Sequence, residues 1–504
     1  MSQVSWSVSS SLEASGYCIT RPQNIYNPLT HHHTVQARGA IRMPPLTLDP
    51  RHGTLVRQLM HAIEQGIRDH RLLPASRLPS VRQLASQLGI STFTVADAYG
   101  RLAQSGALLA RPGDGYYVAR DEQNTPFPPP PTPGPSWLTD HRITPSPELI
   151  QPGAGWLPPD WYPNALLQKA MRQLAKEPDC GGHYEESAGW QPLRQRLWLQ
   201  HGEQGVALAP EGVLLTQGAS QALALVVQGE LRAGETVLVD DPGYCNVIAL
   251  LELSGMRVVG VPWTAQGPDC QQLATLLKAH RPRLFFTNPR LHNPTGASYS
   301  AATAFRVLQL AEAHDCLIVE DDVSAPLVRE GGPTLAALAG LERVIYIGSF
   351  AKTLAPGLRV GYLLGTPERV DRLMRLKALN AIASSGLSER LVLRMLGEPE
   401  QERELSRLRG RLQSAAERWE RGLERIGWQS FCPPAGGLFS WVRLPPGHQD
   451  AAQCAGDALA AGFLLAPGSQ FRQGQPATPF LRCNLAYSPP GLLDFLQRWA
   501  ERRP

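Results

Sequence analysis

The chain has 504 residues, of which 43% are hydrophobic and 18% are charged. This composition excludes a wholly disordered protein, and at about 150 residues per domain the length predicts two to four domains. The net charge of +4 is small for such a length, so the chain as a whole is not a polycation. Only five of its 48 basic residues are lysines, which leaves few candidates for lysine-based chemistry.

The cysteines and the apolar residues exclude further classes of protein. The eight cysteines form no CxxC pair and no cluster with zinc-ligand spacing, so we expect no metal site. A disulfide scaffold is implausible at this size, and a reducing cytoplasm is the expected location. The N-terminus has no basic segment followed by an apolar one, and no run of about 20 apolar residues occurs. We therefore predict neither a signal peptide nor a membrane-spanning helix.

Two segments lack the periodicity of packed structure. Residues 1–45 are polar and serine-rich and predict a disordered leader; Met43 is an alternative start, which would make the preceding residues a mis-called extension. A triple histidine within the leader is an alternative metal-binding tract. Residues 122–148 contain the run TPFPPPPTPGPS, which favours an extended, semi-rigid linker over an SH3-type ligand. The domains are therefore expected at 46–121 and 149–504.

The segment from 51 to 120 is more basic than the rest of the chain. It has nine arginines against four acidic residues, so its net charge of +5 exceeds that of the whole protein. Clustered positive charge is typical of a surface that binds the phosphates of nucleic acid.

The same segment predicts two helices joined by a tight turn. Ser80 is placed to cap the first helix and Gly89 to end it, and Ser91 is placed to cap the second. Two helices separated by one glycine-centred turn form a helix-turn-helix, whose second helix enters the DNA major groove. The residues expected at the base edges are Ser91, Thr92, Phe93 and Thr94.

A small β-wing is predicted after the second helix. Residues 108–119 indicate two strands joined by a Pro-Gly-Asp-Gly turn, and Arg111 at the base of this wing is placed to reach a phosphate or the minor groove. The whole stretch LPSVRQLASQLGISTFTVADAYGRLAQSGALLARPGDGYYVA resembles the winged helix of GntR-family repressors.

The resemblance to GntR repressors implies a double-stranded DNA operator as partner. Its RLPSVR signature runs from Arg77 to Arg82 and places Arg77 and Ser80 in the DNA-binding surface, with Arg82 contacting a phosphate or a base. Thr92 stands where many relatives have Arg or Lys just after the capping serine, so the operator sequence does not follow from the resemblance.

From about residue 150, short apolar runs alternate with helical stretches. Such alternation is typical of an α/β domain with a mostly parallel sheet, whose ligands lie at the carboxyl ends of the strands. A long helical stretch at about 400–427 and a smaller α+β piece follow. The seven predicted strands are Val213–Thr216, Thr236–Asp240, Arg257–Pro262, Leu284–Thr287, Leu317–Asp321, Val344–Gly348 and Arg359–Leu364.

Two residues near strand ends are candidates for chemistry. Lys352, in GSFAKTLAPGLRVGY, is the only lysine that follows an apolar strand into a turn. Asp321 ends another apolar strand, where a carboxylate is costly unless a cation pairs with it. Glu320 and Asp322 remain alternatives, because only one acid should face a ligand.

Further motifs provide a phosphate cradle and contacts to a flat ring. A GAS motif lies between a strand and a helix, where backbone N–H groups can hold an anion. Tyr244, in DDPGYCN, is placed to stack on a ring, and Asn293, in HNPTG, to donate to a phenolic oxygen. With an amine and an acid, these are the groups that a pyridoxal phosphate site requires. The predicted cradle comprises Gly218, Ala219, Ser220, Ser349 and Arg359.

With these motifs in this order, residues from about 150 to 504 resemble a fold-type I, class I aminotransferase. The chain as a whole resembles the MocR subfamily of GntR regulators over about 450 residues. The resemblance implies that Lys352 forms a Schiff base with pyridoxal phosphate and that Asp321 pairs with the pyridine nitrogen. It also implies a head-to-tail homodimer in which Tyr184 of the other subunit reaches the phosphate, and that Arg482, in LRCNLAYS, holds the α-carboxylate of an amino-acid effector.

The expected architecture is multidomain: an α+β winged helix-turn-helix head and an α/β aminotransferase-like domain with a seven-stranded, mostly parallel sheet and a small C-terminal α+β subdomain. Two positions depart from the resemblance. Val323 and Ser324 stand where these families have a tyrosine closely after the aspartate, and loss of that hydroxyl should weaken transamination without abolishing cofactor binding. Ala351 stands where a hydroxyl residue often precedes the lysine.

The leading interpretation is a transcriptional regulator whose C-terminal domain senses pyridoxal phosphate, an amino acid or both. One alternative is an active aminotransferase that carries a DNA-binding head; the missing tyrosine and the intact winged helix argue against it. Another is a C-terminal domain that serves only as a dimerisation scaffold. The retained Lys352, Asp321, Asn293 and Arg359 argue against the scaffold.

Overall fold

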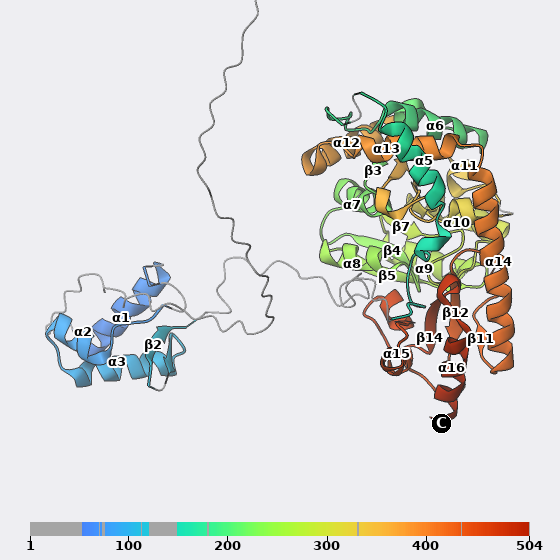
Figure 1. Ribbon diagram of the computed structural model, residues 1–504. Helices are drawn as coiled ribbons and strands as arrows, with labels where there is room; N and C mark the ends of the chain where they lie inside the picture. Colours follow the sequence, from blue (N-terminus) through green and yellow to red (C-terminus); the bar gives the residue numbers. More distant parts are fainter. Residues whose placement is uncertain are drawn as a thin grey trace, which may run out of the picture. The chain divides into compact units, whose positions relative to one another are not determined.

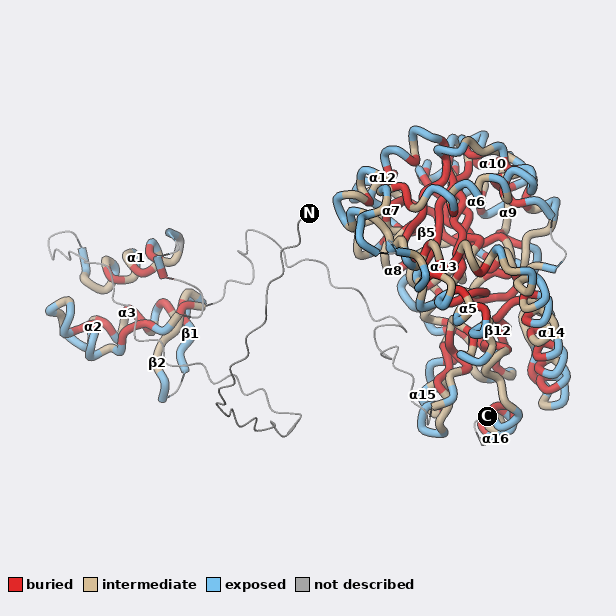
Figure 2. Tube along the Cα trace, turned by 45° about the horizontal axis from the view of Figure 1, so that its top comes forward, coloured by how far each residue is buried: buried red, intermediate tan, exposed pale blue. Residues whose placement is uncertain are grey.

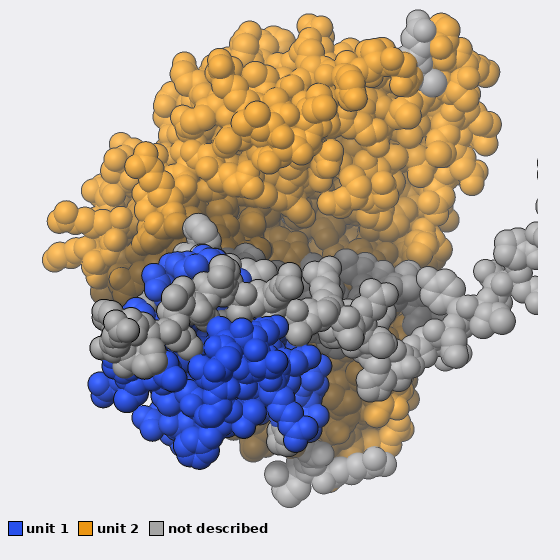
Figure 3. Space-filling view, turned by 90° about the vertical axis from the view of Figure 1, so that its left-hand side faces the viewer, with its two compact units in different colours: residues 1–130 blue, residues 131–504 orange. Residues whose placement is uncertain are grey.

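The structure, a computed structural model, divides the chain into two compact units, residues 1–130 and 131–504 (Figures 1 and 3). The predicted leader at 1–45 and the predicted linker at 122–148 lie outside the residues that the structure describes. The described residues are 53–69, 71–72, 76–111, 113–119, 149–178, 181–329, 332–434 and 436–502.

The N-terminal unit has the predicted helices and wing. The first helix of the helix-turn-helix begins at a capping box, in which the Ser80 side chain accepts the Gln83 N–H and the Gln83 side chain accepts the Ser80 N–H. The same helix ends at Gly89, which has a left-handed φ of 64° and forms the turn to the second helix. The Ser91 hydroxyl caps the next helix by accepting the Thr94 N–H at 3.0 Å. The elements are α1 (Leu55–Arg68), α2 (Val81–Leu88), α3 (Thr92–Gln104), β1 (Leu108–Arg111) and β2 (Gly115–Val118).

A small apolar core holds the head together. Leu59 and Ile63 of α1 pack with Leu84 of α2 and Leu102 of α3, and all four are fully buried. Burial of each such side chain contributes about 1.5–3 kcal/mol. Tyr99 crosses this core, and its hydroxyl donates to the Pro79 carbonyl at 3.0 Å. The bond fixes the segment that enters α2 against α3, so these two helices are held together.

The C-terminal unit is built on an eight-stranded sheet of order β3-β10-β9-β8-β7-β4-β5-β6. β4, β5, β7, β8 and β9 run parallel, and β10 and β6 run antiparallel to their neighbours. The prediction missed the short β6. It also began the last strand two residues too early, because Arg359 has a left-handed φ of 52° and cannot belong to the strand. The strands are β3 (Val213–Thr216), β4 (Thr236–Asp241), β5 (Arg257–Thr264), β6 (Gly267–Pro268), β7 (Leu284–Thr287), β8 (Leu317–Asp321), β9 (Val344–Ser349) and β10 (Gly361–Leu364).

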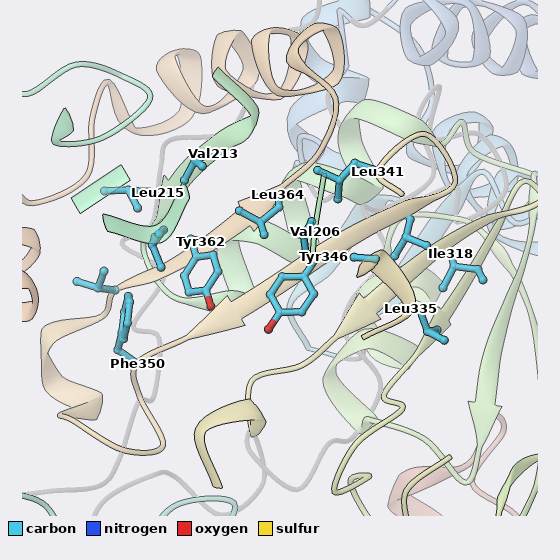
Figure 4. Packing of buried hydrophobic residues seen from close by; sticks show 14 of the residues in the cluster. Val206, Val213, Leu215, Ile318, Leu335, Leu341, Tyr346, Phe350, Tyr362 and Leu364 are labelled. Carbon is cyan, nitrogen blue, oxygen red and sulfur yellow. The ribbon is translucent and has the colours of Figure 1, made fainter. Parts of the chain in front are cut away.

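Helices cover both faces of this sheet and leave its strands buried (Figures 1 and 2). One face packs against α7 (Ala219–Glu230), α8 (Cys245–Leu253) and α12 (Pro367–Ala381). The other face carries a larger cluster, part of which Figure 4 shows. Its helices are α5 (Asn164–Leu174), α6 (Gln191–Glu203), α9 (Cys270–His280), α10 (Ala301–Ala313), α11 (Leu335–Ala339) and α13 (Gly386–Gly397).

A smaller subdomain follows α14 (Gln401–Arg425), the long helix that extends beside it (Figure 1). Its four-stranded antiparallel sheet has the order β11-β12-β14-β13 and packs on α14 through the buried Trp419. Among the described residues, no helix combines the length and the apolar character that a membrane span requires. The elements are β11 (Gln429–Ser430), β12 (Phe439–Arg443), α15 (Ala451–Ala460), β13 (Ala466–Pro467), β14 (Phe480–Asn484) and α16 (Pro490–Arg502).

Candidate cofactor site and DNA-binding surface

The structure separates the three consecutive acids at the end of β8. The Glu320 carboxylate accepts the N–H groups of Leu335 and Ala336 at 2.9 Å each, and so caps α11. The Asp322 carboxylate binds the Arg290 guanidinium and accepts the Tyr346 hydroxyl at 3.0 Å. Both acids are therefore committed to the protein itself.

Asp321 is different, because one of its carboxylate oxygens is buried without a partner. The Val323 N–H interacts with the carboxylate, yet Oδ1 has no hydrogen-bond partner among the described residues. Burial, together with the nearby Asp322, raises the pKa of Asp321 to about 7. A buried carboxylate with an unmet acceptor favours a cationic N–H ligand, which supplies both the missing bond and the missing charge.

Lys352 follows β9 on the turn toward η5 (Pro356–Leu358) and is half-buried. Its Nζ donates to the Gly155 carbonyl. Burial lowers the pKa of Lys352 to about 8, with Arg482 and Arg359 acting in the same direction and Asp321 against them. A lowered pKa leaves part of the amine uncharged near neutral pH, which is the form that attacks an aldehyde.

The predicted phosphate cradle comes together at the start of α7. Strand register places Thr216, Gly361 and Ser349 side by side across β3, β10 and β9. Gly218 precedes α7 at φ 80°, and a Cβ there would lie 2.8 Å from the Arg359 guanidinium. The glycine thus admits an arginine to the open helix N-terminus, where backbone N–H groups face anions. Ala219 and Ser220 form the first turn of α7, and the Ser349 hydroxyl accepts the Ala351 N–H at 3.2 Å.

Tyr244 and Asn293 also lie close to Arg482. Tyr244 is the N-cap residue directly before α8, and its hydroxyl accepts a bond from the Asn246 amide at 3.0 Å. Burial raises the pKa of Tyr244, and so does its proximity to Cys245 and Asp321. The Asn293 side-chain oxygen accepts from the Arg482 guanidinium at 2.9 Å, which leaves its amide N–H groups as donors.

Arg482 is buried on β14 of the small subdomain, with only 3% of its surface exposed. Its guanidinium carbon lies 4.7 Å from the Phe439 ring centroid and 4.6 Å from that of Phe471. One of its N–H groups donates to the Gly153 carbonyl at 2.5 Å. Burial lowers the pKa of Arg482 to about 10, so its charge is costly there and an arriving anion would offset that cost.

The sequence reasoning missed the residues that position these groups. Asn288 donates to the Asp321 carbonyl at 2.5 Å and accepts the Asn293 N–H at 2.7 Å, so one side chain links two predicted site residues. His292 is fully buried, stacks on Trp263 with ring centroids 3.7 Å apart, and holds the same loop. The HNPTG text contains His292, but no sequence signal points to Asn288 or to the Gly155 carbonyl.

Tyr184 lies apart from this constellation. It is 79% exposed on the loop that precedes α6, beside a cavity lined by Ser385, Gly386 and Leu387. Its predicted role depends on the second subunit of a dimer, and the structure contains one chain, so that role stays a prediction.

The N-terminal unit presents the residues predicted to contact DNA bases at one exposed end of α3. Ser91, Thr92 and Phe93 are exposed, and Phe93 shows 81% of its surface. Arg82 is exposed at the start of α2. An aromatic side chain so exposed at a helix N-terminus is unfavourable in water and suits contact with a base edge or a thymine methyl group.

Arg77 and Arg111 are bound to the wing itself. The Arg77 guanidinium donates to the Asp114 carbonyl and lies 3.5 Å from its carboxylate. Arg111 lies over the Tyr117 ring at 4.5 Å, and the Tyr117 hydroxyl donates to Asp114 at 2.7 Å. Both arginines therefore shape the wing, and their DNA contacts stay predictions.

Comparison with known proteins assigns both units. The family model for bacterial regulatory proteins of the gntR family matches residues 55–118, and the model for class I and II aminotransferases matches residues 158–498. The chain belongs to the MocR subfamily of GntR regulators. This MocR protein is a DNA-binding transcriptional regulator whose C-terminal domain has the fold-type I aminotransferase architecture and uses pyridoxal phosphate.

Relatives of this MocR protein span both of its units. The HTH-type transcriptional regulator TauR of Rhodobacter capsulatus is 30% identical over 455 residues, which cover 83% of this chain and 90% of TauR. The uncharacterized HTH-type transcriptional regulator YdfD of Bacillus subtilis is 28% identical over 460 residues, or 86% of this chain and 92% of YdfD. Among solved structures, LysN, the α-aminoadipate aminotransferase of Thermus thermophilus complexed with N-(5'-phosphopyridoxyl)-L-leucine, is 28% identical, with a TM-score of 0.65 over 72% of this chain and 96% of LysN.

The site of the MocR protein fits pyridoxal phosphate on its own geometry. The unmet Asp321 oxygen suits a protonated ring nitrogen, and the half-buried Lys352 amine has the lowered pKa that condensation with an aldehyde requires. The Gly218 cradle with Arg359 suits a phosphate. In the described part of the chain, no group of three or more His, Cys, Asp or Glu side chains is arranged to hold a metal ion.

Proposed function

We propose that the regulator senses an amino acid at its cofactor site and converts binding into a change of the small subdomain. The observation that carries this proposal is the position of Arg482. It stands on β14 of the small subdomain, yet its guanidinium donates to Asn293 of the large one. The same side chain that would hold the effector carboxylate therefore joins the two subdomains.

Individual residues have distinct roles in holding the cofactor. Asp321 would accept a hydrogen bond from the protonated ring nitrogen, Tyr244 would stack on the ring, and Asn293 would donate to the phenolic oxygen. When bound, pyridoxal phosphate would supply an aldehyde that condenses with a primary amine, and Lys352 is the amine that would hold it. The phosphate is held by Gly218, Ala219, Ser220, Ser349 and Arg359.

The functional unit is a head-to-tail homodimer in which each Tyr184 reaches the phosphate of the other subunit. Tyr184 is 79% exposed in one chain, and exposed apolar side chains occur on α12 and α13. Leu379 shows 86% of its surface and Leu387 43%. Large exposed apolar side chains mark interaction surfaces, and a second subunit would cover them.

The effector is an amino acid whose carboxylate binds Arg482 in a bidentate manner. Such a carboxylate competes with the Asn293 oxygen and the Gly153 carbonyl for the same N–H groups. Loss of the Asn293 contact removes a direct bond between β14 and the large subdomain. Because a ligand shifts a conformational equilibrium only through contacts that differ between states, this exchange of partners is the step that couples effector to movement.

The head binds a double-stranded operator with α3 in the major groove. Thr92 and Phe93 face the bases, and Arg82 contacts a phosphate. Two heads in a dimer imply paired half-sites separated by whole helical turns. A protein that reads a bacterial operator works in the cytoplasm, so we place it there.

An active aminotransferase is the second candidate. The likeness to the α-aminoadipate aminotransferase favours it. Against it, Val323 and the buried Ser324 occupy the stretch in which a tyrosine hydroxyl is expected, so this chain lacks that donor to the phenolic oxygen. Regulator and enzyme differ in one measurement: an enzyme releases a keto acid from an amino acid over many cycles, and a sensor does not.

The decisive experiment is the visible absorbance of the purified protein before and after pyridoxal phosphate is added. The wild type should gain the band of covalently attached cofactor, and Lys352→Ala should not. Lys278→Ala, at an exposed position on α9, is the matched control and should keep the band. A band of equal intensity in Lys352→Ala would contradict the assignment.

The effector is then found by screening amino acids for a change in this band. Arg482→Lys keeps the charge but loses the planar fork, so the active amino acid should bind it about tenfold to a hundredfold more weakly. Operator binding is measured with and without that amino acid. A spectral response that leaves operator affinity unchanged would contradict the proposed coupling.

A further inference from the structure

A polar cavity lies in the C-terminal unit, on the side of the sheet that carries α6. Its volume is about 550 Å³, within the range of small-molecule sites. Ser349 of the predicted phosphate cradle lies in its wall, whereas Lys352 and Asp321 do not line it. Its walls come from α6, the start of α14, β9, β10 and the turns that follow β7 and β8. The lining residues that matter here are Arg196, His201, Arg290, Tyr346, Tyr362 and Arg409.

Positive charge predominates in the cavity. Arg290 is paired with Asp322, and Arg409 donates to the Pro326 carbonyl at 2.9 Å and to Glu402 at 3.2 Å. Arg196 is exposed on α6, and the structure records no partner for its guanidinium among the described residues. Arginine offers a planar fork for carboxylate or phosphate oxygens, so the cavity suits a small oxyanion.

His201 supplies an independent sign that the cavity takes a ligand. The side chain lines the cavity and is 1% exposed. Its Nε2 lies 3.0 Å from the Tyr362 hydroxyl, but the buried Nδ1 has no partner among the described residues. Either tautomer leaves Nδ1 with one hydrogen bond to make. An unmet polar atom in the interior is costly, and a bound molecule would satisfy it.

A chain of polar groups leads from His201 to the cofactor site. The rings of Tyr362 and Tyr346 lie next to each other with their hydroxyls on the same side (Figure 4), and the Tyr346 hydroxyl donates to Asp322. Asp322 directly follows Asp321 on the chain. Arg290, which binds Asp322, also lines the cavity. An anion that binds the Arg290 guanidinium would weaken its pairing with Asp322 and so change the charge next to Asp321.

We propose that this cavity is a second ligand site, for a small carboxylate or phosphate anion, and that its occupancy acts on the cofactor site through Arg290 and Asp322. The exposed Arg196 meets the anion first, and His201 bonds the ligand in the interior. The site does not depend on the effector role of Arg482, since Arg482 does not line the cavity.

Binding of citrate and of inorganic phosphate to the cofactor-loaded protein, measured by titration calorimetry, tests the site. The bound cofactor fills the Gly218 cradle and so removes it as a competing anion site. We expect saturable binding of one anion per chain for at least one probe, weakened about tenfold in Arg196→Gln. Arg421→Gln, an exposed arginine on α14, should bind as the wild type does. The probe that binds more tightly tells carboxylate from phosphate.

Absence of saturable binding for both probes, equal weakening in Arg421→Gln, or binding that Arg196→Gln leaves unchanged, as at Arg482, overturns the second site. The coupling has its own readout, the visible spectrum of the bound cofactor. The anion should shift that spectrum in the wild type and leave Arg196→Gln unchanged. Binding without any spectral shift overturns the coupling and leaves the site in place, and neither result bears on operator binding or on the effector role of Arg482.

Discussion

The head and the C-terminal unit place their functional groups in opposite environments. In the head, Arg82, Thr92 and Phe93 are exposed on a scaffold of three helices and a wing. In the C-terminal unit, Asp321 and Arg482 are buried, and the protein displaces their pKa values to about 7 and about 10. The head meets a large polyanion at its surface, whereas the C-terminal unit surrounds a small molecule.

This difference teaches how each unit tolerates change. An exposed arginine that binds phosphate costs little when it is removed from the free protein, because water replaces its contacts. A buried ionised group is stabilised only by its ligand and its neighbours, so the free protein is strained until the ligand arrives. Stability measurements should therefore respond to mutations in the C-terminal site, and DNA affinity to mutations in the head.

The largest expected effect is on the free energy of unfolding of the cofactor-free protein, which Asp321 should make dependent on pH. Its pKa is raised from 3.8 to about 7 by burial, so the folded state binds the proton more tightly than the unfolded state does. The resulting stability is fully present below about pH 4 and is lost as the pH rises through 7, by up to about 4 kcal/mol. Asp321→Asn removes this dependence, as thermal unfolding of the cofactor-free protein at pH 5 and pH 8 will show.

Asp494→Asn on α16 serves as the control for that series, because its carboxyl is exposed. It should lose stability between pH 5 and pH 8 as the wild type does. If Asp321→Asn showed the same loss, the buried carboxyl would not be its source. The claim that burial in the C-terminal unit displaces the pKa of Asp321 would then be contradicted.

A smaller effect is expected from Arg82 and Arg77, and it sharpens the contrast within the head. Arg82→Ala should weaken binding to DNA selected by the wild type by about 1–3 kcal/mol and lower the salt slope by about 1, with little change in thermal stability. Arg77→Ala should lower the thermal stability of the head, because it removes the bonds to Asp114 that hold the wing. Fluorescence anisotropy at several salt concentrations measures the first, and thermal unfolding the second.

Arg232→Ala, exposed in the C-terminal unit, should match the wild type in both measurements. An Arg82→Ala variant with unchanged affinity would show that the head meets DNA with another face. Equal loss of stability in both variants would mean that Arg82, too, holds the head together.

The smallest effect concerns the cap of α2. Ser80→Ala removes the acceptor for the Gln83 N–H and half of the capping box, at a cost of about 1 kcal/mol. Amide exchange in α2 should become about fivefold faster, while the cofactor spectrum stays unchanged. Ser86→Ala, an exposed position within the same helix, should not accelerate exchange. Equal acceleration in Ser80→Ala and Ser86→Ala would mean that packing, and not the capping box, stabilises α2.

Local chemistry explains why much of the fold could be predicted. A serine cap, a glycine at positive φ and a periodic pattern of apolar residues act over a few residues, so α2, α3 and the wing can be predicted from their local sequence. The same holds for the buried strands, which read as apolar runs, and for Lys352 after β9. The prediction failed where backbone geometry overrides the run, as at Arg359, whose left-handed φ of 52° delays β10 until Gly361.

The sequence by itself determined the two units, their order, the cofactor class and a short set of candidate residues, because each of these depends on near neighbours along the chain. Only the tertiary structure decided which acid at the end of β8 is available. Glu320 binds α11 and Asp322 binds Arg290, and these partners lie 15 or more residues away. The same holds for Arg482 with Asn293 and for the cavity beside His201. Burial and long-range pairing set the charge of these groups, and no local pattern records them.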